Sequence, residues 1–168
     1  ELKNSKFFDS RILGTIEDAM SIDNSKYVIA IGKNSVRKSI NDKYKNACWL
    51  KLVSAFSYVD SSVSINNGSI VAAGAVIQPD VKIGIHCIIN TKASVDHDCQ
   101  IGDFVHISVG VTLCGDVTVG SCSQIGAGTV VKPGIKIGNN VMIGAGSTVV
   151  SDIPSNNMAY GTPAKIIK

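Results

Sequence analysis

Three histidines occur in the chain, at positions 86, 97 and 106, and one of them stands between two carboxylates. His97 is preceded by Asp96 and followed by Asp98. Imidazole is the side chain best suited to remove a proton near neutral pH. A carboxylate bonded to its second nitrogen would fix the tautomer and raise the basicity of the ring. Residue types alone leave two questions open: His97 could be a plain surface histidine, and Asp96 competes with Asp98 for the partner role.

The histidines lie in a strictly periodic part of the chain. From Val59 to Val149 an aliphatic residue recurs every six positions, sixteen times without a miss. The residue four positions later is small or aliphatic, as at Ala75, Cys87 and Ser123. A fixed short period indicates one unit stacked many times, and it fits neither a helix nor an isolated strand. β-Sandwich strands, which recur at irregular spacing, are also a poor match.

A six-residue unit fits one flat side of a prism, and three sides make a coil. The series predicts a little over five coils, a rod on the order of 25 Å long. Six glycines directly follow an inward aliphatic residue, where we expect corners that need backbone freedom. They are Gly84, Gly102, Gly120, Gly126, Gly138 and Gly144.

This geometry places the other candidate residues relative to His97. Gly115 follows His97 by one full coil. Its N–H could donate to the oxyanion of the transition state, which would stabilise that state by ~3 kcal/mol. Alternatively, Gly115 could be only a turn glycine. His106 follows by half a coil and falls on another side of the prism. His97 and His106 could then meet only across a subunit boundary. His86 is expected to be solvated.

Residues 1–50 are different and indicate an α/β unit. The pattern predicts a strand end at 6–9, a helix at 15–24 capped by Thr15, a buried parallel strand at 27–32 and a helix at 34–46. A Gly-rich first turn is absent, and we expect a missing N-terminal piece. Residues 51–168 form the second predicted domain, whose prolines after Val149 should prevent further coils.

Several residues of the N-terminal unit follow its strands, where α/β folds hold nucleotides. These candidates are Asp9, Gly32, Lys33, Asn34 and Arg37. A purely structural turn explains a G-x-N loop equally well.

Composition narrows the function class. The net charge of +3 has no basic stripe to suggest nucleic acid, and no 18-residue apolar run suggests membrane insertion. Three scattered histidines and unpaired cysteines form no metal-ligand set. The odd cysteine count favours a reducing compartment, and we expect a soluble cytoplasmic protein. The cysteines are Cys48, Cys87, Cys99, Cys114 and Cys122.

The hexads resemble the left-handed parallel β-helix acyltransferases, and the left-handed winding is implied by that resemblance. Three segments are similar to the bacterial sugar acetyltransferases, a group that includes UDP-4-amino-sugar N-acetyltransferases and sialic acid O-acetyltransferases. These segments are 29–40, 88–120 and 160–167. The family's Gly-rich N-terminal turn is missing here.

The resemblance implies roles for matching residues. His97 matches the general base and Asp98 its acidic partner, and His106 matches a histidine that touches acetyl-CoA. Ala127 and Ala145 resemble small residues of the acetyl-CoA groove. The C-terminal tail matches the family segment around the adenine end of acetyl-CoA; its residues here are Gly161, Pro163, Ala164 and Lys165. Lys165 could face the 3′-phosphate of the cofactor or be simply solvated. The loops with Asp9 and Gly32 match those that hold UDP.

The sequence therefore predicts a metal-free, acetyl-CoA-dependent N-acetyltransferase acting on a UDP-linked amino sugar in glycan biosynthesis. A sugar O-acetyltransferase acting on sialic acid is the alternative, and a non-catalytic β-helix binding module is the second alternative. Outward apolar residues, namely Phe104, Val109 and Met142, indicate a partner surface. Together with the family's habit, they predict a homotrimer with active sites between subunits.

Overall fold

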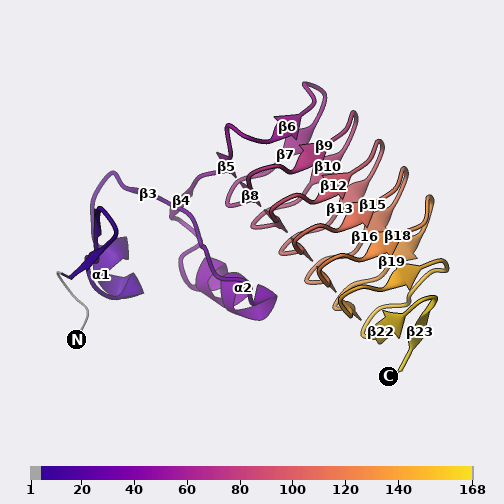
Figure 1. The fold of residues 1–168 in the computed structure, drawn as a ribbon. Helices are drawn as coiled ribbons and strands as arrows, with labels where there is room; N and C mark the ends of the chain where they lie inside the picture. Colours follow the sequence, from indigo (N-terminus) through magenta and orange to yellow (C-terminus); the bar gives the residue numbers. More distant parts are fainter. Residues whose placement is uncertain (1–4, 168) are drawn as a thin grey trace.

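The computed structural model of the chain describes residues 5–167. A small N-terminal unit is followed by a long rod of stacked triangular coils, with one helix of the unit lying beside the rod (Figure 1). Among the described residues, no helix is long and apolar enough to cross a membrane.

The N-terminal unit contains short elements. In chain order they are β1 (Lys6–Phe7), β2 (Ser10–Arg11), α1 (Ile16–Met20), β3 (Lys26–Tyr27), α2 (Asn34–Lys43) and β4 (Cys48–Trp49). The predicted N-cap is confirmed: Thr15 and Asp18 bond each other's backbone N–H in a capping box. The predicted order of strand, helix, strand and helix is present as β1, α1, β3 and α2, but β1 pairs antiparallel with β2, and β3 pairs in parallel with β4, which was not predicted.

The strand predicted at 27–32 is much shorter than expected. It ends at Tyr27, and residues 28–31 are irregular. Ile29 is buried, but Ile31 is 37% exposed. Within residues 5–167 only β4 pairs with β3, so the apolar run lacks the neighbours that would make it a buried strand.

Three sheets form the sides of the rod. The eight-stranded sheet holds β5 (Leu52–Val53), β8 (Ile70–Val71), β11 (Ile88–Ile89), β14 (His106–Ile107), β17 (Gln124–Ile125), β20 (Met142–Ile143), β22 (Met158–Gly161) and β23 (Ala164–Ile166). The six-stranded sheet holds β6 (Tyr58–Val59), β9 (Val76–Ile77), β12 (Ser94–Val95), β15 (Thr112–Leu113), β18 (Val130–Val131) and β21 (Thr148–Val149). The five-stranded sheet holds β7 (Ser64–Ile65), β10 (Lys82–Ile83), β13 (Gln100–Ile101), β16 (Thr118–Val119) and β19 (Lys136–Ile137).

The inward ladders form the core, as predicted. Each strand pairs in parallel with the strand eighteen residues later, so that Ile83 lies beside Ile101 and Ile89 beside Ile107. The aliphatic residues of the middle coils are fully buried, and so are the small residues four positions later. The polar side chains among these small residues form hydrogen bonds inside the core. Ser123 Oγ, for example, donates to the Gly138 carbonyl at 2.7 Å.

The rod has more coils than expected. Its hexad phase begins one strand earlier than Val59, at Val53 in β5. Beyond Val149 the prolines do not stop it, because Ile153 bridges Ile137 and β22 pairs with β20. This last coil is sixteen rather than eighteen residues long, which hides it from a strict six-residue pattern. The chain then reverses, and β23 pairs antiparallel with β22.

The corners differ from the prediction in one respect. Positive φ angles occur at the third residue after the inward aliphatics from Ile65 to Ile143, for example 61° at Asp98 and 58° at Asp116. The glycines directly after the aliphatic do not have positive φ angles. They are needed because the coils approach closely: a Cβ at Gly84 would lie 2.7 Å from the Gly102 carbonyl carbon.

One corner of the rod, between the five-stranded and eight-stranded sheets, is closed by a polar ladder. Ile85 N–H donates to Asp103 Oδ1 at 2.9 Å, and Asp103 N–H donates to Ser121 Oγ at 3.1 Å. Ser121 N–H donates to Asn139 Oδ1, and the backbone N–H of Asn139 donates to Ser155 Oγ. Each coil thus satisfies the corner amide of the coil before it.

Candidate active site

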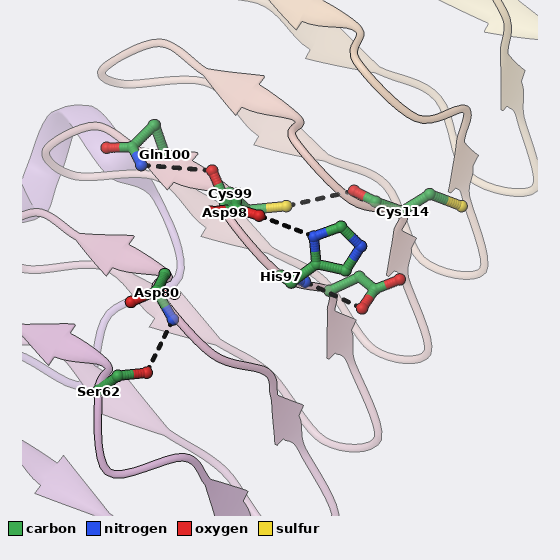
Figure 2. A network of polar contacts seen from close by, with 8 residues as sticks. Ser62, Asp80, His97, Asp98, Cys99, Gln100 and Cys114 are labelled. Carbon is green, nitrogen blue, oxygen red and sulfur yellow. Dashed lines mark hydrogen bonds and ion pairs between the residues drawn. The ribbon is translucent and has the colours of Figure 1, made fainter.

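His97 and Asp98 meet at the corner between β12 and β13, on the outside of the rod. Asp98 has a φ of 61°, which turns its carboxylate back toward the preceding residue. His97 Nδ1 therefore lies 2.8 Å from Asp98 Oδ2, although neighbours on a flat strand would point apart (Figure 2). Aspartate tolerates this left-handed conformation better than most residues, and the predicted pairing is confirmed.

The bond leaves His97 with an open second nitrogen. A carboxylate only accepts, so neutral His97 carries its proton on Nδ1 and keeps a lone pair on Nε2. No protein group among residues 5–167 bonds that Nε2. The bond to Asp98 and the charge of Asp96 raise the pKa of His97 above its ordinary value. With a side chain 59% exposed, the ring can act as a base toward an external ligand.

Asp96 has a different task. Its Oδ1 accepts from the backbone N–H of His97 at 2.9 Å, so it holds the corner rather than the ring. Asp98 is thus the residue that orients the imidazole.

Gly115 lies directly above the ring, one coil along the same corner. A Cβ there would come within 2.6 Å of His97 Cε1 and Nε2. The N–H of Gly115 donates no hydrogen bond within the described part of the chain. The free donor is as expected from the spacing, whereas the space beside Gly115 is occupied by the imidazole of His97, which the spacing did not predict.

His106 occupies a second region, on the outer face of the eight-stranded sheet. Its Nδ1 lies 3.3 Å from the Gly32 carbonyl oxygen, and its Nε2 lies 3.2 Å from Asn90 Nδ2. Burial, and next the charge of Arg37, lower the pKa of His106. His97 and His106 are on different sides of the rod, as predicted. The environment thus shifts their pKa values in opposite directions.

The corner beside His106 presents free backbone donors. Val109, Ala127 and Ala145 stack on it in successive coils, between the eight-stranded and six-stranded sheets. Their N–H groups have no hydrogen-bond partner within residues 5–167. Small side chains at 127 and 145 leave these amides accessible to a long ligand.

The tail residues lie further along the same sheet. Gly161 N–H donates to Ser147 Oγ at 3.2 Å, and Ala164 is buried in β23. Pro163 and Lys165 are exposed. The structure therefore places the tail on the side of the rod that holds His106, away from the His97 corner.

The N-terminal candidates separate into two groups. Gly32 reaches His106, and Lys33 is exposed beside it, whereas Asp9 lies in the exposed turn between β1 and β2. Asn34 and Arg37 are buried between α2 and the rod, where Asn34 donates to the Cys122 and Ser123 carbonyls. Their substrate role stays a prediction, and the structure gives both a role in packing.

A groove lies between α2 and the eight-stranded sheet. Its volume is about 540 Å³. The lining includes Lys33, Ser35, Lys38, Gln124, Asn140 and Met142. Lys38 is paired at 2.6 Å with Asp42, which also lines the groove, so Lys33 and the first turn of α2 are the features here that suit an anionic ligand. Among residues 5–167 no group of three or more His, Cys, Asp and Glu side chains could hold a metal ion.

Two expectations about exposure are wrong. His86 is only 1% exposed, with its Nε2 3.0 Å from Asn41 Oδ1 and its ring stacked on Phe104 at 5.4 Å. Phe104, expected to face outward to a partner, is 6% exposed. In both cases α2 and Trp49 cover the corner. Val109 and Met142 are exposed, as predicted.

Comparison with known proteins identifies the repeat. Residues 116–151 match the family model described as bacterial transferase hexapeptide (six repeats), which fits the left-handed winding expected for the rod. A comparison with curated protein sequences finds no match.

Solved structures resemble most of the chain. The acetyltransferase domain of PglB from Neisseria gonorrhoeae is 37% identical with a TM-score of 0.82, over 83% of this chain and 69% of that one. It was also solved with acetyl coenzyme A. PerB from Caulobacter crescentus, in complex with CoA and GDP-perosamine, is 38% identical with a TM-score of 0.83, over 86% of this chain and 70% of that one. WeeI from Acinetobacter baumannii is 25% identical with a TM-score of 0.91, over 98% of this chain and 82% of that one.

Proposed function

Because the chain belongs to the bacterial hexapeptide-repeat acetyltransferases, we propose that it transfers the acetyl group of acetyl-CoA to the amine of a UDP-linked amino sugar. The relatives support a nucleotide-sugar acceptor, since PerB was solved with CoA and GDP-perosamine. The observation that carries the proposal is the His97–Asp98 pair, with Nε2 open to solvent beside Gly115.

The site geometry suits direct transfer. The sugar amine attacks the thioester carbon while His97 Nε2 removes its proton, and Asp98 stabilises the imidazolium. Gly115 N–H donates to the developing oxyanion. When the tetrahedral intermediate collapses, the C–S bond breaks and His97 returns the proton to the CoA thiolate.

Cysteine chemistry does not suit this site. Cys99 is buried, its Sγ points at the Cys114 carbonyl, and burial raises its pKa to about 11 (Figure 2). Burial raises the pKa of Cys87 to about 12. Neither thiol is available as a thiolate nucleophile near neutral pH. Cys114 adjoins Gly115, but its sulfur points away from His97 (Figure 2). We therefore propose that no acyl-enzyme forms.

The donor occupies the other side of the rod in this proposal. His106 and the free amides of Ala127 and Ala145 face the pantetheine arm. The tail, with Gly161, Pro163 and Lys165, lies near the adenine end. Asp9, Lys33 and the groove beside α2 serve the nucleotide sugar in this proposal.

One chain presents the two regions on different sides, so a complete site needs a second copy. Val109, which is 46% exposed, lies on the corner between the His106 face and the six-stranded sheet. Val130 is 42% exposed on that sheet. We propose a homotrimer in which the six-stranded side packs against a neighbour and brings His97 of one chain toward His106 of the next.

The test is acetyl transfer to a panel of UDP- and GDP-linked amino sugars, followed by CoA release. His97→Ala should lower turnover by about 10²–10⁴-fold. Binding of acetyl-CoA, measured by thermal shift, should persist in this variant. Lys82→Ala, an exposed change on the five-stranded sheet, is the control and should retain activity. A His97→Ala enzyme with more than about a third of wild-type activity would refute the role of the base.

The same panel separates the alternatives. Turnover on free sialic acid with none on nucleotide sugars would identify an O-acetyltransferase. Absence of turnover and of any thermal shift at millimolar acetyl-CoA would instead favour a binding module without catalysis.

A further inference from the structure

Arg37 is a fully buried cation that contacts mainly backbone carbonyls. Its side chain is 0% exposed. Nε donates to the His86 carbonyl at 3.0 Å, and Nη2 donates to the Phe104 carbonyl at 3.0 Å. Asn34 Oδ1 accepts a further bond from Nη2 at 2.8 Å. No carboxylate pairs with it in the described part of the chain, so a buried charge is held by dipoles alone.

The remaining guanidinium nitrogen holds the loop before α2. Nη1 donates to the Ile31 carbonyl at 2.9 Å and to the Gly32 carbonyl at 2.8 Å. Arg37 therefore joins this loop to the coil that begins β14, because its bonds to residues 104 and 105 lie just before His106. A rigid fork of five donors is suited to such bridging, and a lysine is not.

The Gly32 carbonyl is shared by Arg37 and His106. This oxygen accepts from Nη1 of Arg37 and also lies 3.3 Å from Nδ1 of His106. Because a carbonyl only accepts, His106 must carry its proton on Nδ1. The orientation of the imidazole thus depends on where Arg37 places residue 32.

Asn90 completes the arrangement at the opposite nitrogen. Its Oδ1 accepts from Thr91 N–H at 2.8 Å, so its Nδ2 is the group that faces His106 Nε2 at 3.2 Å. A protonated Nε2 would place two donors against each other. Burial and the charge of Arg37 lower the pKa of His106 in the same sense.

We propose that Arg37 is a positioning residue that holds His106 as a neutral imidazole with its proton on Nδ1. In this form His106 cannot take a proton through the occupied Nε2, so His97 remains the base of the site. The consequence for acetyl transfer rests on the proposed function, but the tautomer of His106 does not.

The test is ¹⁵N NMR of the histidine rings in the full-length apo protein, with His106 assigned by His106→Asn. Wild type should show the Nδ1–H tautomer and a neutral ring at pH 7. Arg37→Met should mix the tautomers and raise the pH at which His106 titrates. Arg37→Lys should keep the low titration point but lose the tautomer preference. Lys38→Met is the charge-matched control on the same helix, and it should leave His106 unchanged.

Kinetics give a second measurement. Arg37→Met should raise the acetyl-CoA KM by about 10- to 100-fold through misplacement of His106, with a smaller change in kcat. Even if the Arg37 variants do not fold, the wild-type spectrum can still overturn the proposal. An Nε2–H tautomer or an imidazolium at pH 7 in wild type would overturn the proposal, as would the same His106 shift in Lys38→Met.

Discussion

Gly115 lies against the imidazole of His97 so closely that residue 115 has no room for a side chain. A Cβ at this position would be 2.6 Å from both Cε1 and Nε2 of the ring. The contact involves the nitrogen that we propose takes the substrate proton. The ring is held on its other side by Asp98, so it cannot yield without losing a bond.

Gly115→Ala should therefore reduce activity by about 10²-fold or more, because the imidazole must leave its productive position. Its melting temperature should change little, since the displaced ring is exposed. Gly134→Ala is the matched control on the same corner, with φ of 73° and open space around its Cβ position. It should lose about 1–2 kcal/mol of stability and keep its activity. Equal activity in both variants would contradict the close contact.

Replacing Asp98 should move the pH profile of the reaction. A base works only when deprotonated, and Asp98 raises the pKa of His97, so the wild-type rate should rise through a pH above the ordinary histidine value. Asp98→Asn should shift this rising limb to lower pH. Its plateau should fall by about 10- to 100-fold, less than for a buried triad aspartate, because this pair is exposed.

The control for this profile is Asp96→Asn, which removes a charge but not the ring contact. Asp96→Asn should shift the rising limb of the pH–rate profile by less than Asp98→Asn does, and it should keep most of the plateau rate. A limb that stays in place in Asp98→Asn would show that another group limits the rate.

Acid should destabilise the packing of α2 on the rod. Burial, and next the charge of Arg37, lower the pKa of His86, and Asp103 opposes them. A lowered folded pKa means that the unfolded chain binds the proton more readily. The stability from neutral His86 is therefore present above about pH 6.5 and is lost as the pH falls through the folded pKa.

Melting temperatures between pH 5 and 8 test this effect. Wild type should lose stability toward pH 5, and His86→Asn should be less stable at pH 8 but flatter across the range. Asparagine is chosen because residue 86 has a φ of 52°. The melting temperature of His86→Asn should still depend somewhat on pH, because the pKa of His106 is also lowered. An unchanged slope in His86→Asn would exclude His86 as the cause.

Val109→Glu should break the assembly. Glutamate on an apolar corner would bring charge into the proposed subunit contact. Light scattering should show a trimer for wild type and smaller species for the variant, with activity lost in proportion. Thr118→Glu, on the five-stranded sheet, should remain trimeric and active. A wild-type monomer that still acetylates its substrate would refute both the trimer and the shared site.

The rod could be predicted from the sequence because the residue pattern that specifies each side is short and is repeated along the chain. Every inward aliphatic occupies the same environment, so the six-residue period alone fixes sides, coils and core. The choice of Asp98 over Asp96 came from the family resemblance, because the residues alone left both open; the φ of 61° at Asp98 is what turns its carboxylate back to His97. The last coil was missed because it is two residues short, which breaks the period without breaking the pairing.

Contacts between distant segments could not be predicted in this way. A six-residue period marks which side chains point outward but not what covers them, and α2 covers His86 and Phe104. The helix lies more than forty residues earlier in the chain, and nothing in the hexads marks where it docks. Asn90 was missed for the same reason, because its role depends on the orientation of His106, which depends on the loop at Gly32.

The antiparallel return of β23 has a consequence for the free end of the rod. A stack of parallel coils ends in rows of unpaired amides and carbonyls, which would otherwise be a template for another chain. On the eight-stranded side β23 occupies that row, and its reversed direction breaks the parallel repeat. Two rods therefore cannot join there in register to continue the coil. The segment that we propose lies near the cofactor's adenine end thus also covers the last parallel strand of the eight-stranded sheet.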